Sequence, residues 1–221
     1  MQSSEVLSNV RAPKVARARR LLKRGFRESD NLFLAEGPQA CREAALAGKV
    51  TELFLTQEAF DRYSEIVEVV ENSGATITIC TAAVIEQFSS TVTPQGMTAV
   101  VRMWEQNPAE VFKSGAKLAV ALTAVRDPGN AGSVIRVADA AGVDGVIMSN
   151  DSVDLFNPKV VRASVGSLFH LPIATGQDLA ETIASARAAG MQVLAADAGG
   201  DSLYSEVQLA KPTLWVFGNE A

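Results

Sequence analysis

Short apolar runs alternate with longer amphipathic segments through the first half of the chain. Runs rich in apolar or β-branched residues, bounded by polar or glycine turns, predict strands at residues 31–34, 52–55, 76–79 and 97–101. Helix formers or helical periodicity predict helices at residues 38–47, 58–72 and 81–88. Because strands and helices alternate, we expect an α/β fold with a mostly parallel sheet.

The same alternation starts again near residue 116. Strands are predicted at residues 117–122, 145–148, 171–174, 192–195 and 213–217, and helices at residues 130–141, 158–163 and 178–189. Between the two halves, residues 102–116 are mixed and contain Asn107-Pro108 and Ser114-Gly115, which is typical of a linker. We therefore expect two α/β domains, at residues 1–105 and 116–221.

Composition narrows the class of protein. The chain has 221 residues, of which 48% are hydrophobic and 20% charged, so it is not disordered, collagenous or a coiled coil. No apolar run approaches the roughly 18 residues needed to cross a membrane, and no signal-peptide core is visible. We expect a soluble cytoplasmic protein without membrane contact.

The small number of histidines and cysteines excludes several kinds of metal and catalytic site. With one histidine and two distant cysteines, a multi-histidine metal site is impossible, and a thiolate metal site or disulfide framework is not expected. Any histidine-based triad would have to use His170. We therefore expect no metal.

The charge is placed unevenly. The whole chain has a formal net charge of −5, yet residues 1–27 hold eight basic residues against Glu5 alone. The remaining residues hold 12 basic and 24 acidic groups. This asymmetry favours a basic arm directed at a polyanion, carried on an acidic body.

The arm is predicted to be helical. Pro13 suits a first helical turn, and Val15, Ala18 and Leu22 form a thin apolar stripe. By the same spacing, another face carries Arg17, Arg20, Arg24 and Arg27.

Two interpretations of this arm remain. It is either a solvated basic helix that only packs on its own domain, or a surface that contacts phosphates, which the scarcity of acidic residues favours. A membrane-surface role is disfavoured, because the apolar face lacks large residues. The candidate phosphate contacts in the arm are Arg11, Lys14, Arg17, Arg20, Arg24 and Arg27.

The first segment with candidate chemistry, residues 123–136, leaves a predicted strand and opens a helix. Gly129 and Gly132 permit close backbone approach, and a helix N-terminus favours anions. The segment matches neither the dinucleotide fingerprint nor the phosphate loop of NTPases. Asn130 could simply cap the helix.

Arg136 lies six residues after Asn130 among apolar neighbours. Because an unpaired buried charge is costly, an arginine in this setting needs a partner. On the residues alone, a structural salt bridge to Asp139 or Asp127 is as good an explanation as a functional role.

Two further segments are weaker signals by themselves. Residues 154–167 carry Lys159 and Arg162 before small residues, and a surface loop is the default interpretation. Residues 215–220 form an apolar strand that ends in Gly218, and ligands of open α/β sheets bind beyond such strand ends.

Together, the three segments resemble the SpoU (TrmH) family of RNA ribose 2′-O-methyltransferases within the SPOUT class. The first matches the family's Asn-x5-Arg motif through Asn130 and Arg136. The second resembles the family's stretch from a lysine to Ala-Ser-x-Gly through Lys159, Arg162, Ser164 and Gly166. The third matches the family's Gly-Asn-Glu motif through Gly218, Asn219 and Glu220. Residues 31–101 resemble the family's substrate-binding domain. The family's final loop and helix should follow Glu220, so we expect the end of the domain to be missing here.

The resemblance implies methyl transfer from S-adenosylmethionine to a ribose 2′-hydroxyl of RNA, with ribosomal RNA favoured over transfer RNA. It implies a C-terminal trefoil knot, incomplete in this chain, and a homodimer. The implied catalytic residues are Arg136, Asn130 and Glu220, and the implied cofactor-binding residues are Gly218, Asn219 and Ala196. Lys159, Arg162 and Ser164 join the arm as implied RNA contacts.

The role of Arg136 stays open at this stage. The family assigns a general-base role to this arginine, whereas its high pKa favours a charged group that stabilises the forming alkoxide. Two other function classes compete with the methyltransferase: a non-catalytic RNA-binding module and a Rossmann-type oxidoreductase. The missing G-x-G-x-x-G pattern argues against the second.

Overall fold

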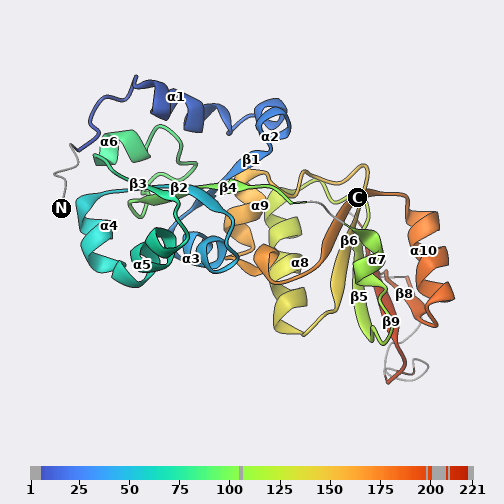
Figure 1. Ribbon diagram of the computed structural model, residues 1–221. Coiled ribbons are helices and arrows are strands. Elements are labelled where there is room, and N and C mark those ends of the chain that lie inside the picture. Colours follow the sequence, from blue (N-terminus) through green and yellow to red (C-terminus); the bar gives the residue numbers. More distant parts are fainter. Residues whose placement is uncertain (1–5, 105–106, 198, 201–207, 209, 219–221) are drawn as a thin grey trace. The chain divides into compact units, whose positions relative to one another are not determined.

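The computed structural model describes residues 6–104, 107–197, 199–200, 208 and 210–218 (Figure 1). The described residues form two compact units, which we call the first and second units. The first unit comprises the chain up to Trp104 together with Phe156–Phe169, and the second unit comprises the rest. Each unit has its own sheet.

The sheet of the first unit is mixed. It contains β1 (Leu32–Glu36), β2 (Val50–Leu55), β3 (Thr76–Ile79) and β4 (Met97–Arg102), in the order β1-β4-β2-β3. β2 and β3 are parallel, but β4 lies between β1 and β2 and runs antiparallel to both. The expectation of a mostly parallel sheet is therefore wrong for this half. The last strand, β4, inserts between β1 and β2, and both of its pairings are antiparallel.

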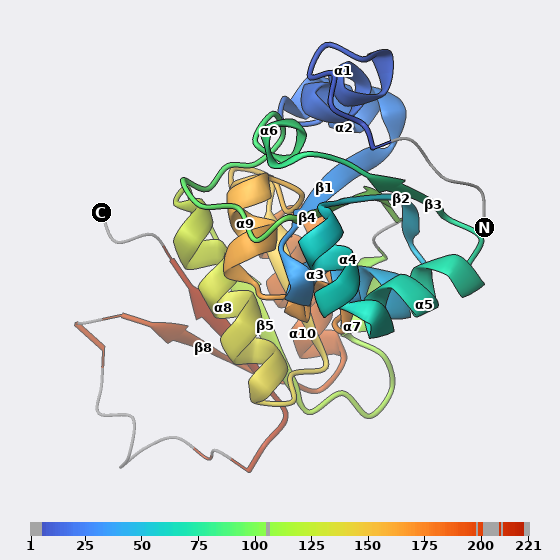
Figure 2. The ribbon, with the colours of Figure 1, turned by 90° about the vertical axis from the view of Figure 1, so that its left-hand side faces the viewer.

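Helices cover both faces of this sheet (Figures 1 and 2). One face carries α3 (Pro38–Leu46), α4 (Gln57–Arg62) and α5 (Ser64–Asn72), and the other carries α1 (Pro13–Arg20), α2 (Arg24–Asp30) and α6 (Ala82–Ile85). The expected single helix over residues 58–72 is broken at Tyr63, whose φ of −117° and ψ of 46° are not helical.

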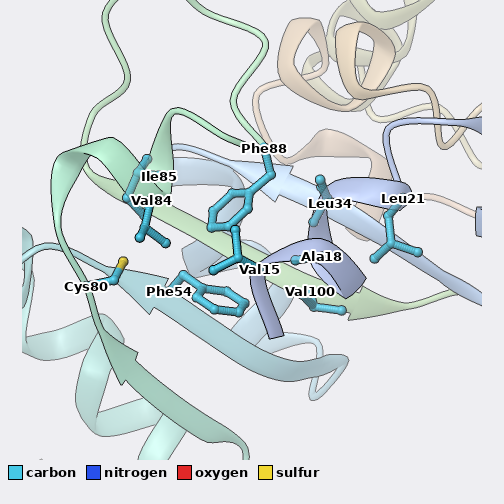
Figure 3. Packing of buried hydrophobic residues seen from close by; sticks show 10 residues of the cluster. All are labelled: Val15, Ala18, Leu21, Leu34, Phe54, Cys80, Val84, Ile85, Phe88 and Val100. Atoms are coloured by element: carbon cyan, nitrogen blue, oxygen red, sulfur yellow. The ribbon is translucent and has the colours of Figure 1, made fainter. Parts of the chain in front are cut away.

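The arm packs on its own domain. Val15, Ala18 and Leu21 are at most 3% exposed and belong to the core cluster that contains Phe54 and Phe88 (Figure 3). The rest of this cluster is Leu34, Cys80, Val84, Ile85 and Val100. Because the helix ends at Arg20 and α2 starts at Arg24, the four arginines expected on one helical face belong to two helices, and that expectation is wrong.

The segment with Lys159 and Arg162 joins the first unit. It forms α9 (Pro158–Ala163) and the short 3-10 helix η1 (Ser167–Phe169). The ring of Phe156 lies 4.7 Å from that of Phe33 and 5.1 Å from that of Trp104. This grouping differs from the sequence-based ranges 1–105 and 116–221, because aromatic packing draws a segment of the second half into the first core.

The sheet of the second unit is entirely parallel, as the sequence predicts. Its strands are β5 (Leu118–Leu122), β6 (Gly145–Ser149), β7 (Ile173–Gln177), β8 (Gln192–Ala196) and β9 (Thr213–Phe217), in the order β7-β6-β5-β9-β8. α8 (Pro128–Ala140) lies on one side, and α7 (Pro108–Val111) and α10 (Leu179–Ala188) lie on the other (Figure 1). α7 forms within the segment expected to be a linker.

Alternation along β5 and β9 divides their side chains between the two faces. Ala119, Ala121, Leu214 and Val216 point into the core under α7 and α10. Leu118, Val120, Trp215 and Phe217 point to the side of α8. Among the residues that the structure describes, no helix is long and apolar enough to span a bilayer.

Candidate active site

The first and third segments meet at the carboxyl-terminal edge of the parallel sheet. Leu122 at the end of β5 is in register with Phe217 of β9 and with Met148 of β6. Directly beyond, the Thr123 N–H donates to the Phe217 carbonyl over 2.9 Å. The strand pairing therefore brings the loop before α8 next to Gly218, nearly 100 residues later in the chain.

Hydrogen bonds fix the loop that leads from β5 into α8. The Ala124 N–H donates to the Ser149 hydroxyl over 3.0 Å, and the residue adopts a φ of 52°. The Val125 carbonyl accepts from the Val153 N–H over 2.9 Å. A hydrogen bond from the Ser149 hydroxyl holds the pKa of Asp151 below its ordinary value, so this carboxylate stays ionised and the loop stays tied.

Asp127, rather than Asn130, caps α8. Its carboxylate accepts from the Asn130 N–H over 2.8 Å, and Pro128 occupies the first turn. The interpretation of Asn130 as the cap is therefore wrong. Its side chain is exposed and makes no hydrogen bond within the described part of the chain, so it is available to a ligand.

Arg136 is exposed on α8 and has no ion pair with any described residue. Asp139 instead pairs with His170 over 2.8 Å, and Asp127 caps the helix, so the structural salt bridge considered above is wrong. An exposed guanidinium keeps its hydration and needs no internal partner. The charge of Arg136 is thus free to act on a bound anion.

The ends of β8 and β9 present small residues at the same edge. Ala196 is in register with Phe217, and both line an apolar groove of about 610 Å³ that extends between the sheet and α8. Gly218 follows, exposed, with no atom within 4 Å of where a Cβ would stand. Small side chains, open backbone and an aromatic ring suit a nucleoside, and the groove has the size of small-molecule sites. Asn219 and Glu220 lie outside the described residues.

Most candidate RNA contacts of the arm have protein partners. Lys14 lies 2.6 Å from Glu52, and Arg17 lies 3.8 Å from the same carboxylate. The pairs Arg20–Asp30 and Arg24–Glu28 follow at 2.6 and 2.7 Å. The structure brings these residues together as part of the fold, although Arg17, Arg20 and Arg24 remain exposed.

Arg27 and Ser164 have structural roles. The Arg27 side chain is buried and donates to the carbonyls of Leu21 and Leu22 over 3.0 Å, which closes the turn between α1 and α2. The buried Ser164 hydroxyl donates to the Val161 carbonyl over 2.8 Å. Arg11 and Lys23 are exposed and have no ion pair in the described ranges, so they are the arm cations best placed for a phosphate.

In the second segment, Lys159 is exposed whereas Arg162 is engaged. The Arg162 guanidinium bonds to the Ser90 hydroxyl and lies 3.6 Å from the Glu36 carboxylate. Sequence reasoning placed Glu36 in the segment that resembles the substrate-binding domain but gave it no site role. The available signal was an acidic residue between an apolar strand and a Gly-Pro turn, which alone points to no partner.

No group of three or more metal-ligating side chains gathers among the residues described. The edge therefore presents an exposed asparagine at a helix N-terminus and open backbone at two strand ends, and the exposed Arg136 lies six residues after Asn130 on the same helix. Helix N-termini favour anions, and ligands of parallel α/β sheets bind beyond the carboxyl ends of the strands, so this edge is the candidate ligand site of an α/β protein.

The chain is similar to the SpoU rRNA Methylase family over its second half. Residues 117–221 match the model of that family, and residues 12–99 match that of the MRM3-like substrate binding domain. The chain is similar to the 23S rRNA (guanosine(2553)-2′-O)-methyltransferase RlmP of Bacillus subtilis, at 28% identity over 97% of this chain and 82% of the relative.

Two solved structures from Sinorhizobium meliloti resemble the whole chain. An rRNA methyltransferase aligns with a TM-score of 0.84 at 28% identity, over 98% of this chain and 83% of that one. The AdoMet-bound rRNA methyltransferase from the same organism aligns with a TM-score of 0.83 at 27% identity, over 98% of this chain and 82% of that one. The resemblance to the SpoU family is thereby confirmed.

Proposed function

We propose that the protein transfers a methyl group from S-adenosylmethionine to a ribose 2′-hydroxyl of ribosomal RNA. The observation that carries the proposal is the unpaired Arg136 on α8, at the sheet that ends in the open backbone of Gly218. The Bacillus subtilis relative, whose name specifies 2′-O-methylation of 23S rRNA, and the AdoMet-bound neighbour support it.

The residues at the ends of β8 and β9 would hold the cofactor. Ala196 and Gly218 leave space for it, and Phe217 offers an aromatic face. We extend this set to Asn219, which follows Gly218 in the chain. When bound there, S-adenosylmethionine supplies an electrophilic methyl group on a sulfonium.

Arg136 stabilises the negative charge that develops on the 2′-oxygen. A guanidinium is not deprotonated in proteins, so Arg136 acts as a charged, electrostatic group and not as a base. Fixed charges directed at a developing oxyanion are among the larger contributions to catalysis. The exposed Asn130 side chain, near the start of the same helix, orients the RNA, and Glu220 completes the proposed catalytic set.

The direct test combines binding and methyl transfer. The purified chain is titrated with S-adenosylmethionine by calorimetry and then incubated with ribosomal RNA and labelled cofactor, and 2′-O-methylation is mapped. We expect cofactor binding and one modified ribose. Binding of RNA without cofactor binding or methyl transfer would instead establish the non-catalytic RNA-binding module.

We propose a two-domain organisation in which the first unit binds RNA and the second has a parallel sheet of the trefoil-knot type. The match of residues 12–99 to a substrate binding domain supports the first part. The parallel order β7-β6-β5-β9-β8, with β9 between β5 and β8, supports the second. An experimental structure of the protein with cofactor bound tests the knot, since a knot requires a segment that follows β9 to pass through a loop of its own domain.

We further propose a cytoplasmic homodimer that needs no metal for methyl transfer. The support for a dimer is the exposed apolar surface of α8, where Val137 is 64% exposed beside the groove. Light scattering after gel filtration is expected to give twice the chain mass, and fractionation to place the protein in the cytoplasm. Chelation of transition metals is expected to leave the methylation rate unchanged.

A further inference from the structure

The carboxylate of Glu36 lies at the end of β1 and is almost inaccessible, with its side chain 8% exposed. It accepts hydrogen bonds from one short loop. Oε1 accepts from the hydroxyls of Ser89 and Thr91, and Oε2 accepts from the N–H and the hydroxyl of Ser90, both over 3.0 Å. A single side chain thus fixes three successive loop residues.

The only cation paired with Glu36 among the described residues comes from a distant part of the sequence. Arg162 on α9 lies 3.6 Å from Oε2 and donates to the Ser90 hydroxyl. Glu36, the loop and Arg162 all belong to the first unit, so their arrangement is fixed within one compact body. The cluster joins β1, the loop after α6 and the second candidate segment.

The protonation state of this carboxylate is set by the loop. Burial alone would raise the pKa of Glu36, but the hydrogen bonds from Ser89, Thr91 and Ser90 outweigh burial and lower it below the ordinary value. Glu36 is therefore ionised at neutral pH and holds Arg162 by charge as well as through Ser90.

We infer that Glu36 is a positioning residue for RNA binding, which fixes Arg162 and the Ser89–Thr91 loop in the arrangement that receives a phosphate. The inference rests on the proposed function. Glu36 and Ser90 engage one part of a guanidinium that has five N–H donors, and the Arg162 side chain is still 36% exposed. The remaining donors suit a phosphate, which arginine binds with fixed geometry.

The energetic advantage is preorganisation. A free arginine side chain loses rotamer freedom when it binds, and that loss reduces affinity. With Glu36 in place, the loss is incurred when the protein folds and not when RNA arrives. Loss of the carboxylate charge is therefore expected to weaken RNA binding mainly through Arg162, which the loop residue Ser90 helps to hold.

A double-mutant cycle tests this dependence. The full chain carrying Glu36→Gln, Arg162→Gln or both is measured for affinity to a ribosomal RNA fragment by filter binding. Each single variant is expected to bind the RNA fragment about tenfold more weakly, which corresponds to the loss of one charge-assisted hydrogen bond. The double variant is expected to bind no more weakly than Arg162→Gln alone. KM for RNA is expected to rise while kcat and the affinity for S-adenosylmethionine stay unchanged.

Glu52→Gln is the matched control. Glu52 is the carboxylate that pairs with Lys14 in the same unit; its side chain is 11% exposed, and it does not contact Arg162. We expect this variant to lose thermal stability without the tenfold loss of RNA affinity. If Glu36→Gln does not fold, Ser90→Ala replaces it, since it removes the hydroxyl that links Glu36 to Arg162.

Three results would overturn the inference: additive losses in the double variant, an equal loss of RNA affinity in Glu52→Gln, or a folded Glu36→Gln or Ser90→Ala protein with unchanged affinity. A wild-type chain that binds neither S-adenosylmethionine nor RNA would instead refute the proposed function. The two failures are therefore distinguishable.

Discussion

At the scale of single residues, exposure decides which charged groups are available for chemistry. Arg136 is exposed and unpaired within the described chain, whereas Arg27, which is equally basic, is buried and bonded to carbonyls. From the sequence alone, both arginines were candidate site residues. The difference comes from a side-chain direction that no residue type specifies.

Replacement of Arg136 by alanine is expected to lower kcat for methyl transfer by at least a hundredfold, while the affinity for S-adenosylmethionine stays within about twofold. The loss corresponds to a few kcal/mol of charge stabilisation at the 2′-oxygen. Single-turnover kinetics and calorimetry measure the two quantities. Arg136→Lys is expected to lose methyl transfer as well, because lysine keeps the charge but lacks the planar guanidinium with its fixed set of N–H donors. Retention of more than a tenth of the wild-type rate would contradict this role.

The two cysteines predict a pH dependence of stability. Burial raises the pKa of both Cys41 and Cys80 to about 12, from an ordinary value of 9.0. The folded state keeps these thiols protonated while the unfolded chain ionises, so the free energy of unfolding is expected to fall between about pH 9 and pH 12. Urea titrations at several pH values measure it.

Cys41→Ala is the comparison that isolates one thiol. Between about pH 9 and pH 12, the free energy of unfolding of this variant is expected to fall less steeply than that of the wild type. The two slopes are expected to differ by up to about 1.4 kcal/mol per pH unit, the contribution of one thiol. An identical slope in the two proteins would show that Cys41 does not contribute. Neither thiol is expected to react with iodoacetamide at neutral pH in the native state, because the thiolate is the reactive form.

At the scale of elements, α1 combines a structural and a basic face. Val15 and Ala18 are buried in the core, whereas Arg17 and Arg19 on the same helix are exposed. The structural interpretation of the arm therefore holds for one face, and phosphate contact stays a prediction for the other. Removal of the whole arm would damage the core of the first unit, so charge substitutions are the cleaner test of phosphate contact.

The double variant Arg11→Gln/Lys23→Gln is expected to weaken RNA binding and to flatten its salt dependence. Each lost phosphate contact changes the slope of log affinity against log salt by roughly 0.7–0.9. Arg187→Gln, at the exposed end of α10 in the second unit, is the control and should leave the slope unchanged. If the arm variant keeps the wild-type slope, Arg11 and Lys23 make no phosphate contact.

At the scale of the whole molecule, the two compact units do not follow the order of the chain. Phe156 and Phe169 come after four elements of the second unit, yet they pack with Phe33 and Trp104 of the first. The folding of the first unit therefore depends on a segment that is synthesised later. This dependence can be measured with one substitution.

Phe156→Ala is expected to destabilise the first unit by about 3–5 kcal/mol, since it removes a fully buried ring. Hydrogen exchange is the appropriate measurement, because it reports on each strand separately. Protection is expected to fall in β1 and β4 and to persist in β5 and β6. Loss of protection confined to the second unit would contradict the assignment of this segment.

The sequence by itself determined the strands of both units and the parallel sheet of the second unit. Apolar runs and amphipathic spacing depend on local chemistry, so residues 76–79 and 213–217 were predicted with the observed bounds. The motif containing Asn130 and Arg136 likewise identified the family, because a fixed spacing of residue types survives without any structure.

Only the tertiary structure decided which distant residues meet. The antiparallel insertion of β4, the aromatic core around Phe156 and the pairing of Glu36 with Arg162 all join segments far apart in the chain. Local periodicity specifies which side of an element is apolar, but not which other element covers it. That choice depends on the packing and charge of the whole fold, because buried rings need complementary surfaces and buried carboxylates need donors.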